Sequence, residues 1–466
     1  MFKPFKKIGV NKYQLIRGGP KNVRIVVYTT PTLLQHLNQD LALTQLAEAA
    51  FLPRVVSPVI GMPDIHQGFG LPIGGVMATK GLISVGAVGM DINCGVRLLF
   101  SNLIYNKKDF SSQKLRSLIH QIEKLIPVGL GGRHKQKVSL ELKKITEEGV
   151  EYLVKQGYAL KQDLESIEEK GRMKGARLET VGPRAKSRAI KQLGTLGSGN
   201  HFIEIQKIKE VFDQTTASAW GLRENQICIM IHSGSRALGH QTCLDYTNLF
   251  WKLKNKYNLN VSRKGLAALP LETPEGRGYF AAMAAAVNFA FANRAMMTYF
   301  IRQVFKKNFN QELKLLYDVA HNIAKWESYE GRQLLIHRKG ATRALPAGHP
   351  QNPKKYLKTG HPAIVPGSMG TSSYIMVGLA KNKETFYSIN HGAGRLMSRR
   401  EAKKKIREKV FARSMRNIVY NKPFKVVADE APQAYKNINE VVDTLVEAGL
   451  TKKVVQLVPL AVIKGN

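Results

Sequence analysis

Short apolar runs separated by Gly-rich breaks make up most of this chain. Such runs are typical of buried strands, and they predict strands at 23–30, 201–206, 227–231, 314–322 and 456–465. Residues 278–307 differ, because small and apolar residues continue through them and predict one long helix suited to close packing. A helical pattern also ends near Leu52, and another covers the strongly basic segment 401–419.

The segment 107–180 is highly charged and follows a helical pattern, which predicts a charged helical insertion or subdomain. No Pro/Ser-rich linker and no internal repeat divides the chain. The polar residues that can carry chemistry run from position 91 to position 391, on both sides of this segment. We therefore expect one interwoven α+β domain over residues 1–466, a single large mixed α/β domain, with 107–180 inside it.

The charge of the chain indicates the kind of partner. Its 71 Lys and Arg outnumber 34 Asp and Glu, and the formal net charge is +37. An excess of this size favours a polyanion such as nucleic acid, because neutralising phosphates releases their counterions. The alternative explanation, that the charge serves solubility alone, is less favoured. Under either explanation the charge by itself identifies no fold or chemistry.

The cysteines and the terminal sequence indicate the compartment. Cys94, Cys228 and Cys243 are too few for a disulfide framework, which fits a reducing environment. The N-terminal residues lack the apolar region of a secretory signal. The longest apolar stretch is interrupted by Asn288, Asn293 and Arg294, so we expect no membrane span and a cytoplasmic protein.

Five polar residues in Gly- or Asn-rich breaks have the chemistry of a metal site. They are Asp91, Cys94, His201, His232 and His321. Carboxylate, thiolate and imidazole together suit a borderline ion such as Mn, Zn, Fe or Co, and a thiolate can bridge two ions. Taken singly, each histidine is more often structural and Cys94 more often a small buried hydrophobe. The combination nevertheless predicts a site for two ions.

A second group of residues suits a nucleotide. Gly367, Ser368, Gly370, Thr371 and Ser373 share one turn, in which small residues let backbone N–H groups approach a phosphate. His391 lies beside two glycines and an arginine in HGAGR, and a neutral imidazole can attack phosphorus. The chain contains no Gly-Lys and no Asp-Gly dipeptide, so a Walker A motif and a Lys-x-Asp-Gly nucleophile are excluded. Histidine is therefore the better candidate for covalent nucleotide activation.

The motifs together resemble the RtcB-type RNA ligases. They are GMPDIHQGFGLPIGG, GMDINCGVR, GTLGSGNHFIEI, IHSGSR, DVAHN, HRKGATRA, PGSMGTSSY, HGAGRLMSR, DEAPQAYKNI and PLAVIKG, in the family's order from about residue 60 to the C-terminus. The resemblance implies a GTP- and Mn²⁺-dependent ligase that joins RNA 3′-phosphate or 2′,3′-cyclic phosphate ends to 5′-hydroxyl ends. It also implies an active site in a central cleft ringed by strand ends and Gly-rich loops.

The resemblance assigns roles to individual residues. Cys94 would bridge two Mn²⁺ ions, one of which also takes His232 and His321 and the other Asp91 and His201. His391 would attack the α-phosphate of GTP and carry GMP before RNA-ppG forms. Tyr435 would lie near the base. The implied nucleotide-binding set comprises Asn200, His201, Phe202, Ile203, Glu204, His321, Asn322, Pro366, Gly367, Ser368, Met369, Ser373, His391, Gly392, Ala393, Gly394 and Lys464.

Two other functions compete with this hypothesis. A metal-dependent RNA 2′,3′-cyclic phosphodiesterase or phosphatase would use the same ligands without a nucleotide pocket, and a non-catalytic RNA-binding protein would explain only the charge. His66, His337, His349 and His361 are either phosphate contacts or structural residues. The expected partners are GTP and RNA, as tRNA halves or cleaved RNA ends, with an archease-type activator as a further candidate. Monomer is the default state.

Overall fold

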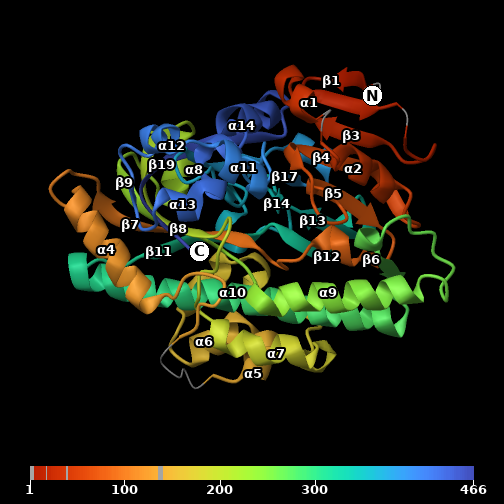
Figure 1. Ribbon diagram of the computed structural model, residues 1–466, viewed down its shortest axis with the longest axis horizontal. Helices are drawn as coiled ribbons and strands as arrows, with labels where there is room; N and C mark the ends of the chain where they lie inside the picture. Colours follow the sequence, from red (N-terminus) through yellow and green to blue (C-terminus); the bar gives the residue numbers. More distant parts are fainter. Residues whose placement is uncertain (1–4, 17, 38–39, 135–139, 466) are drawn as a thin grey trace.

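Two large mixed sheets lie side by side, with helices packed against their outer faces (Figure 1). The computed structural model describes residues 5–16, 18–37, 40–134 and 140–465. The chain is thus of the α+β class, as predicted. Within the described ranges, no helix combines the length and the apolar character that crossing a membrane requires.

The first sheet carries most of the candidate metal ligands at its strand ends. Its order is β11 (Lys314–Ala320), β7 (Gly95–Ile104), β9 (Gln226–Ser233), β8 (Phe202–Val211), β19 (Thr451–Lys464), β16 (Ser373–Gly378) and β15 (Ala363–Val365), and β18 (Val419–Tyr420) pairs with β19. Along β9, Ile229 and Ile231 face one apolar cluster, while Cys228 and Met230 face another. Both faces are buried, which explains the unbroken apolar run in the sequence.

The second sheet contains the N-terminal strands. Its order is β1 (Phe5–Gly9), β2 (Lys12–Leu15), β3 (Ile25–Tyr28), β4 (Val55–His66), β5 (Ile73–Thr79), β13 (Arg332–Lys339) and β12 (Asn322–Tyr329). The short strands β6 (Leu82–Ser84) and β10 (Ala268–Pro270) form one further pair, and β14 (Ala341–Arg343) and β17 (Ser388–Asn390) form another. Only His321 separates β11 from β12, so the chain passes from the first sheet to the second at this residue.

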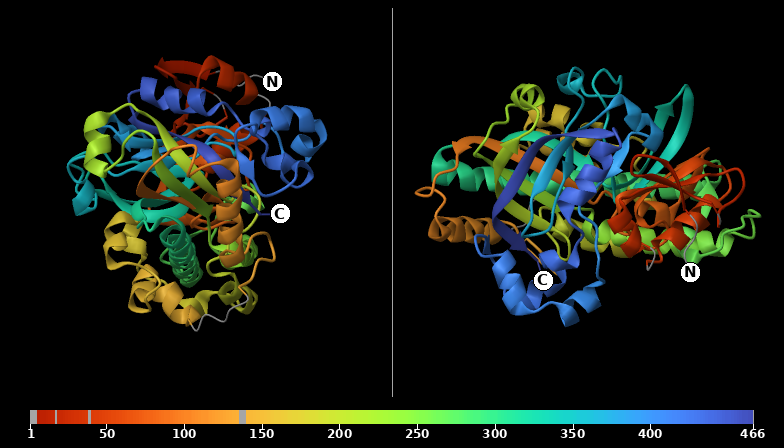
Figure 2. Two further views of the ribbon diagram at one scale, coloured as in Figure 1. Left: turned by 90° about the vertical axis from the view of Figure 1, so that its left-hand side faces the viewer. Right: turned by 90° about the horizontal axis from the view of Figure 1, so that it is seen from above.

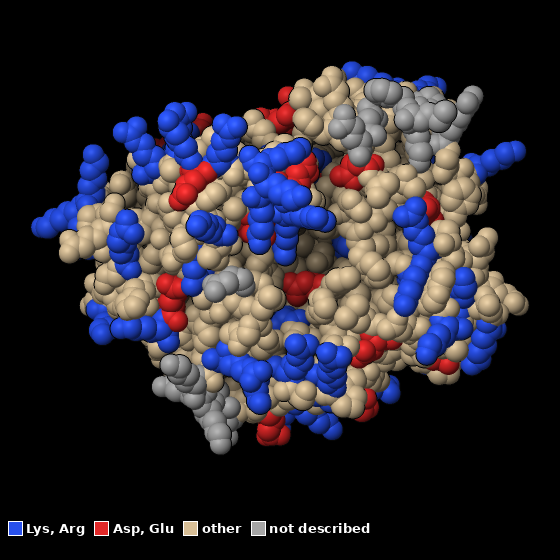
Figure 3. All heavy atoms as spheres, viewed as in Figure 1, with Lys and Arg blue, Asp and Glu red and all other residues tan. Residues whose placement is uncertain are grey.

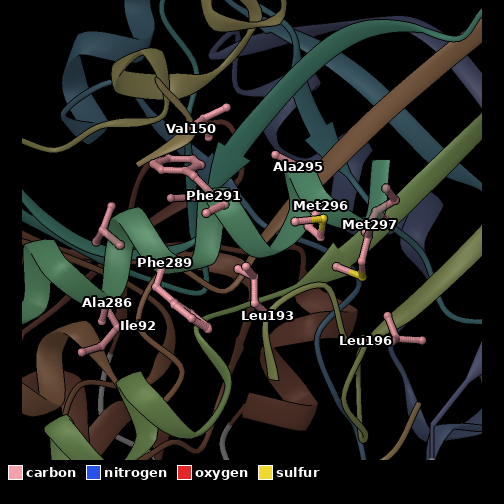
Figure 4. Packing of buried hydrophobic residues seen from close by; sticks show 14 of the residues in the cluster. Ile92, Val150, Leu193, Leu196, Ala286, Phe289, Phe291, Ala295, Met296 and Met297 are labelled. Carbon is pink, nitrogen blue, oxygen red and sulfur yellow. The ribbon is translucent and has the colours of Figure 1, made fainter. Parts of the chain in front are cut away.

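The long helix predicted at 278–307 is confirmed as α10 (Pro274–Phe309). The Thr273 side chain accepts from the Gly276 N–H at its start, and Asn310 ends it in the left-handed conformation. Phe289, Phe291 and their neighbours are buried in the largest apolar cluster (Figure 4). In Figure 2, α10 lies between the sheets and the helices of residues 142–189. Burial on nearly all sides explains the lack of a polar stripe in its sequence.

The helical prediction for 107–180 is correct for three stretches before Gln156 and not for the rest of the described segment. Its helices are α4 (Ser112–Leu125), α5 (Leu142–Glu148) and α6 (Val150–Lys155), and residues 135–139 lie outside the described residues. Beyond them the chain forms short 3-10 turns until α7 (Pro183–Ala189), with positive φ at Gly157, Gly171 and Gly175. Left-handed backbone at these glycines interrupts a helix. Apolar residues of α4, α5 and α6 join the same cluster as α10.

The prediction of a single basic helix at 401–419 is wrong, because the structure has two short helices there. They are α11 (Arg399–Lys405) and α12 (Glu408–Ser414), and Ile406 between them is extended with ψ 126°. Ile406 and Phe411 both pack into the second apolar cluster. In one continuous helix, residues five apart would point about 140° away from each other, so the break lets both reach the core.

The remaining helices cover the sheet faces and the ends of the strands. They are α1 (Pro31–Leu37), α2 (Ala42–Ala50), α3 (Val85–Val88), α8 (Gln214–Trp220), α9 (Arg236–Leu253), α13 (Phe424–Val427) and α14 (Ile438–Glu447). The predicted helix ending near Leu52 corresponds to α2.

A buried charge cluster ties α10 to the first sheet, and its loss is expected to destabilise the fold. The Asp318 carboxylate of β11 accepts from Arg97 and Arg294, and all three side chains are fully buried. Asp318→Asn leaves two buried cations without their counter-ion, so we expect the free energy of unfolding to fall by about 3–5 kcal/mol. Urea titration would measure it. Glu312→Gln, in an exposed pair with Lys306, serves as control and should change it by about 1 kcal/mol or less.

Candidate active site

Strand register brings the predicted metal ligands to one edge of the first sheet. The start of β7 pairs with the end of β9, Gly95 with Ser233, and with the end of β11, Gly95 with Ala320. The start of β8 pairs with β9 through Phe202 and His232. The residues next to these pairs are Cys94, His201, His232 and His321. Pairing across the first sheet therefore brings these four residues to one rim.

Asp91, Cys94 and His201 form a compact cluster of donor atoms, which all lie within 4.8 Å of one another. His201 Nε2 lies 2.8 Å from Asp91 Oδ2 and 3.6 Å from Cys94 Sγ. The other ring nitrogen, Nδ1, lies 3.0 Å from the Leu196 carbonyl, which fixes the ring so that Nε2 faces the cluster. Carboxylate, thiol and imidazole at these distances fit a divalent transition metal.

His232 and His321 extend the cluster on its other side. His232 Nε2 lies 3.2 Å from Cys94 Sγ, and the His232 and His321 ring centroids are 5.5 Å apart. His321 Nδ1 lies 2.9 Å from Thr342 Oγ1, while its buried Nε2 has no hydrogen-bond partner within the described residues. Burial lowers the pKa of both histidines well below the usual range. Neutral imidazoles with a free nitrogen are the form that metals bind.

The pKa values of Cys94 and Asp91 are shifted in opposite directions, and a bound cation would change the protonation state of Cys94. Burial, followed by the nearby Asp91 carboxylate, raises the pKa of the Cys94 thiol well above its usual value. Burial acts to raise the pKa of Asp91 as well, but the hydrogen bond and charge of His201 outweigh it and lower that pKa. A bound divalent cation favours the thiolate, so metal binding and thiol deprotonation are coupled.

Arg294 of α10 fixes the turn that holds Asp91 and Cys94. Its guanidinium donates to the Asn93 carbonyl at 2.9 Å and to the Ser233 carbonyl at 2.8 Å. Asn93 has a φ of 51°, a left-handed conformation that asparagine tolerates better than most residues. The Arg294 side chain thus holds the backbone both beside Cys94 and beside His232. This keeps the metal-donor atoms of Cys94 and His232 at a fixed separation.

His391, the predicted nucleophile, is held by a residue that the sequence analysis missed. Its Nδ1 lies 2.6 Å from Asp64 Oδ2, and the same oxygen accepts from the backbone N–H of His391 at 3.0 Å and of Gly392 at 3.3 Å. Asp64 is fully buried near the end of β4. This contact leaves Nε2 as the ring nitrogen that can act as a nucleophile. The His391 ring centroid is 5.3 Å from that of His321.

One cavity of about 440 Å³ contains most of the predicted site residues. From the predicted sets it is lined by Asp91, Cys94, Asn200, Phe202, His232, His321, Asn322, Pro366, Gly367, Ser368, Met369, His391, Gly392, Ala393, Gly394, Tyr435 and Lys464. His201, Ile203, Glu204 and Ser373 are not among its lining residues. Ile203 is instead packed in the main apolar cluster. Backbone N–H groups of the 366–369 loop are held by hydroxyls, Gly367 by Ser373 and Ser368 by Thr371.

Behind the cavity wall, Glu204 and Ser373 are joined by Gln206. The Gln206 amide donates to Glu204 Oε2 at 2.6 Å and to Ser373 Oγ at 3.2 Å, while Glu204 Oε1 has no partner within the described residues. Burial raises the pKa of Glu204 to about 8. A buried carboxyl with a free oxygen suits a ligand that brings N–H donors.

A second missed residue, Glu430, lies at the same end of the cavity. Its carboxylate accepts from Tyr435 Oη at 2.5 Å and lies 3.4 Å from Lys464 Nζ and 3.3 Å from an Arg395 nitrogen. Glu430 belongs to the DEAPQAYKNI motif, but only its contacts in the structure show that it is a residue of the site. Of the other histidines, His66 lines the cavity, His337 is buried against Ser84 and Met77, and His361 stacks on Tyr317.

Basic side chains surround the approach to this cavity. Arg395 and Arg399 belong to its lining, and Lys403 and Lys404 continue along α11. Figure 3 shows Lys and Arg side chains gathered over α11, beside a hollow in this face of the molecule. The arrangement can attract a polyanion to the mouth of the cavity.

Comparison with known proteins agrees with this geometry. The family model described as "tRNA-splicing ligase RtcB" matches residues 45–465. The chain is 42% identical to a tRNA-splicing ligase RtcB of Thermococcus kodakarensis, with 99% of each chain covered, and 43% identical to one of Aeropyrum pernix, with 95% of each covered. It is 44% identical to an RNA-splicing ligase RtcB homolog 1 of Entamoeba dispar, with 92% of this chain and 82% of the relative covered. A match over nearly the whole chain, including every motif around the cavity, means that this protein belongs to the RtcB family.

Proposed function

We propose that this chain is a GTP- and Mn²⁺-dependent RNA ligase that joins 3′-phosphate or 2′,3′-cyclic phosphate ends to 5′-hydroxyl ends. The observation that carries the proposal is the position of His391. Its ring is oriented by Asp64 at 2.6 Å. It lines the same cavity as the donors Asp91, Cys94, His232 and His321, and it lies beside the 366–369 loop. A hydrolase that uses only metal-activated water needs neither an oriented nucleophilic histidine nor that loop.

In this proposal the donor cluster holds two Mn²⁺ ions. Cys94 would contact both, with Asp91 and His201 on one ion and His232 and His321 on the other. Bound divalent cations neutralise phosphate charge and polarise phosphorus. The choice of Mn²⁺ comes from the family, because the donor set equally suits other borderline ions.

The chain's own residues perform the covalent step. The Nε2 lone pair of His391 attacks the α-phosphorus of GTP, the N–P bond forms, and the bond to the β-phosphate oxygen breaks and releases pyrophosphate. An oxygen of the RNA 3′-phosphate then attacks the same phosphorus and displaces His391, which yields RNA-ppG. The 5′-hydroxyl finally loses its proton as it attacks the RNA phosphorus, and GMP leaves. Asp64 keeps the Nδ1 proton in place throughout.

In this proposal the buried Glu204 carboxyl, behind the cavity wall, selects guanine over adenine. Glu204 can accept from the N1–H and N2–H groups of guanine. Ser373 and Lys464 would lie near the same edge of guanine, and Tyr435 would lie near the guanine ring. Adenine lacks this pair of donors and would leave Glu204 unpaired, which is costly in a buried site. The RNA would be tRNA halves or other cleaved strands in the cytoplasm, with an archease-type activator as a candidate partner and monomer as the default state.

The experiment that tests the proposal is labelling with α-³²P-GTP and Mn²⁺, followed by a denaturing gel and acid treatment. We expect a labelled band that acid removes, because phosphoramidates are acid-labile while phosphoesters are not. Absence of label together with hydrolysis of cyclic phosphate would support the phosphodiesterase alternative instead.

The role of Asp64 provides a separate prediction. Asp64→Asn should lower the rate of GMP-adduct formation by about 10²-fold or more, because an amide can hold the wrong imidazole tautomer. Binding of Mn²⁺, followed by its electron paramagnetic resonance signal, should be unchanged. Asp40→Asn, an acidic residue near the same face but outside the cavity lining, is the control. Normal adduct formation in the Asp64 variant would remove its positioning role.

A further inference from the structure

A second cavity, of about 1020 Å³, lies on the other side of the loop that lines the catalytic cavity. Pro366–Met369 belong to the lining of the first cavity, whereas Gly370, Thr371 and Ser372 belong to the lining of the second. The second cavity is bounded also by the start of α4 and the residues before it, by the end of α12 and the residues after it, by β19, and by the start of α14. We call it the rear groove.

The rear groove has the charge of an anion-binding surface. Lys107, Lys207, Arg413 and Arg416 line it, and none of its lining residues in the described part of the chain is Asp or Glu. Arg413 and Arg416 are exposed, and neither forms an ion pair within the described residues. Asp109, next to the lining residue Phe110, is paired with Lys114. The positive charge of the groove is therefore not neutralised by the protein itself.

The size and the remaining lining residues favour a nucleic acid strand over a small anion. Asn417, Asn437 and Asn439 offer amide N–H donors, while the side-chain oxygens of Asn437 and Asn439 already accept from the Asn439 N–H and from Tyr374 Oη. Hydroxyls come from Ser111, Ser112, Thr371, Ser372 and Ser414. Lys207 lies over the Tyr105 ring, 4.3 Å from its centroid, so a cation and an aromatic ring form one wall. Cations that contact phosphates, beside amides and an aromatic ring that contact bases, are the pattern of single-strand binding sites.

We propose that the rear groove binds a single-stranded segment of the RNA substrate, away from the end that reacts. The inference rests on the proposed ligase function, because it makes RNA the occupant. A strand held there contacts the far side of the loop whose near side lines the nucleotide cavity. The groove would thus add affinity for long RNAs without contributing to the chemistry, and short RNAs that end in the catalytic cavity would not reach it.

The test measures binding of 3′-phosphate RNAs of increasing length by fluorescence anisotropy. For the wild type, affinity should rise once the strand is long enough to reach the groove. Arg413→Ala/Arg416→Ala should remove that rise and lower the slope of log K against log salt by roughly 1.4, since each lost phosphate contact accounts for about 0.7. Lys207→Gln, which removes a lining cation contributed by β8 and not by the α12 region, should weaken long-strand binding independently.

The control is Arg184→Ala/Arg188→Ala, which removes the same charge from exposed positions of α7, on a different side of the molecule from α12 (Figure 1). Equal loss of long-strand binding in this control would overturn the inference, because net charge alone would then explain it. Unchanged binding in the groove variants, or displacement of RNA by tripolyphosphate at matched charge, would overturn it too.

Labelling by α-³²P-GTP separates this inference from the proposed function. The groove variants should form the GMP adduct at the wild-type rate, and a loss of adduct would show that the groove supports the catalytic loop instead of RNA. If the wild type itself forms no adduct, the proposed function fails, while the length dependence of RNA binding still decides whether the groove holds RNA.

Discussion

Cys94→Ala is expected to abolish ligation and to lower the affinity for Mn²⁺ by more than about 10²-fold. Changes to residues around a metal's direct ligands cost about 10–100-fold, and the loss of a bridging thiolate should exceed that range. Cys94 Sγ is the atom shared by the two halves of the donor cluster, 3.6 Å from His201 Nε2 and 3.2 Å from His232 Nε2. Its removal therefore affects both metal positions at once.

Metal content after dialysis and calorimetric titration with Mn²⁺ would measure this effect. Cys228→Ala is the matched control, because Cys228 is also fully buried on the first sheet but faces an apolar cluster. It should keep its metal and its activity. A Cys94 variant with normal metal content and normal ligation would refute the bridging role, whatever the outcome for His391.

The sequence was sufficient to predict the strands that carry the three candidate histidine ligands at or beside their ends. Short apolar runs gave the strands β8, β9, β11 and β19, because buried strands need little besides unbroken apolar character. It could not show that Cys94 and His232 meet, since that depends on the pairing of Gly95 with Ser233 across the sheet. Periodicity describes one element at a time, whereas register is a property of pairs.

The same distinction explains the residues that were missed. Asp64 is 327 positions from His391 along the chain, and nothing near it in the sequence indicates an imidazole partner. Glu430 likewise acquires its meaning from Lys464 and Arg395. The break at Ile406 was missed because two apolar side chains had to reach the same core cluster, and this tertiary demand outweighs the helical propensity of the basic segment.

His391→Ala is expected to bind Mn²⁺ normally and yet to form no GMP adduct. The variant lacks the imidazole that the Asp64 carboxylate orients, whereas the Asp91, Cys94, His201, His232 and His321 donors are untouched. Ligation of 3′-phosphate RNA should fall by on the order of 10⁴-fold or more, because loss of a covalent nucleophile removes the pathway itself. Labelling with α-³²P-GTP and Mn²⁺ titration on the same preparation would measure both properties.

The two substitutions together separate the roles that the cavity combines. Cys94→Ala should lose the metal and therefore the adduct, while His391→Ala should lose the adduct alone. His349→Ala is the control for both, because His349 is half-buried, packs edge-on against Tyr387 and is not among the residues lining the cavity. An adduct retained in the His391 variant would move the nucleophile to another residue. The Asp64 carboxylate also accepts from the Gly392 N–H, so Asp64→Asn tests the placement of the 391–392 turn together with that of the His391 ring. If His391 is the nucleophile, all three variants should lose or slow adduct formation, and only Cys94→Ala should also lose the metal.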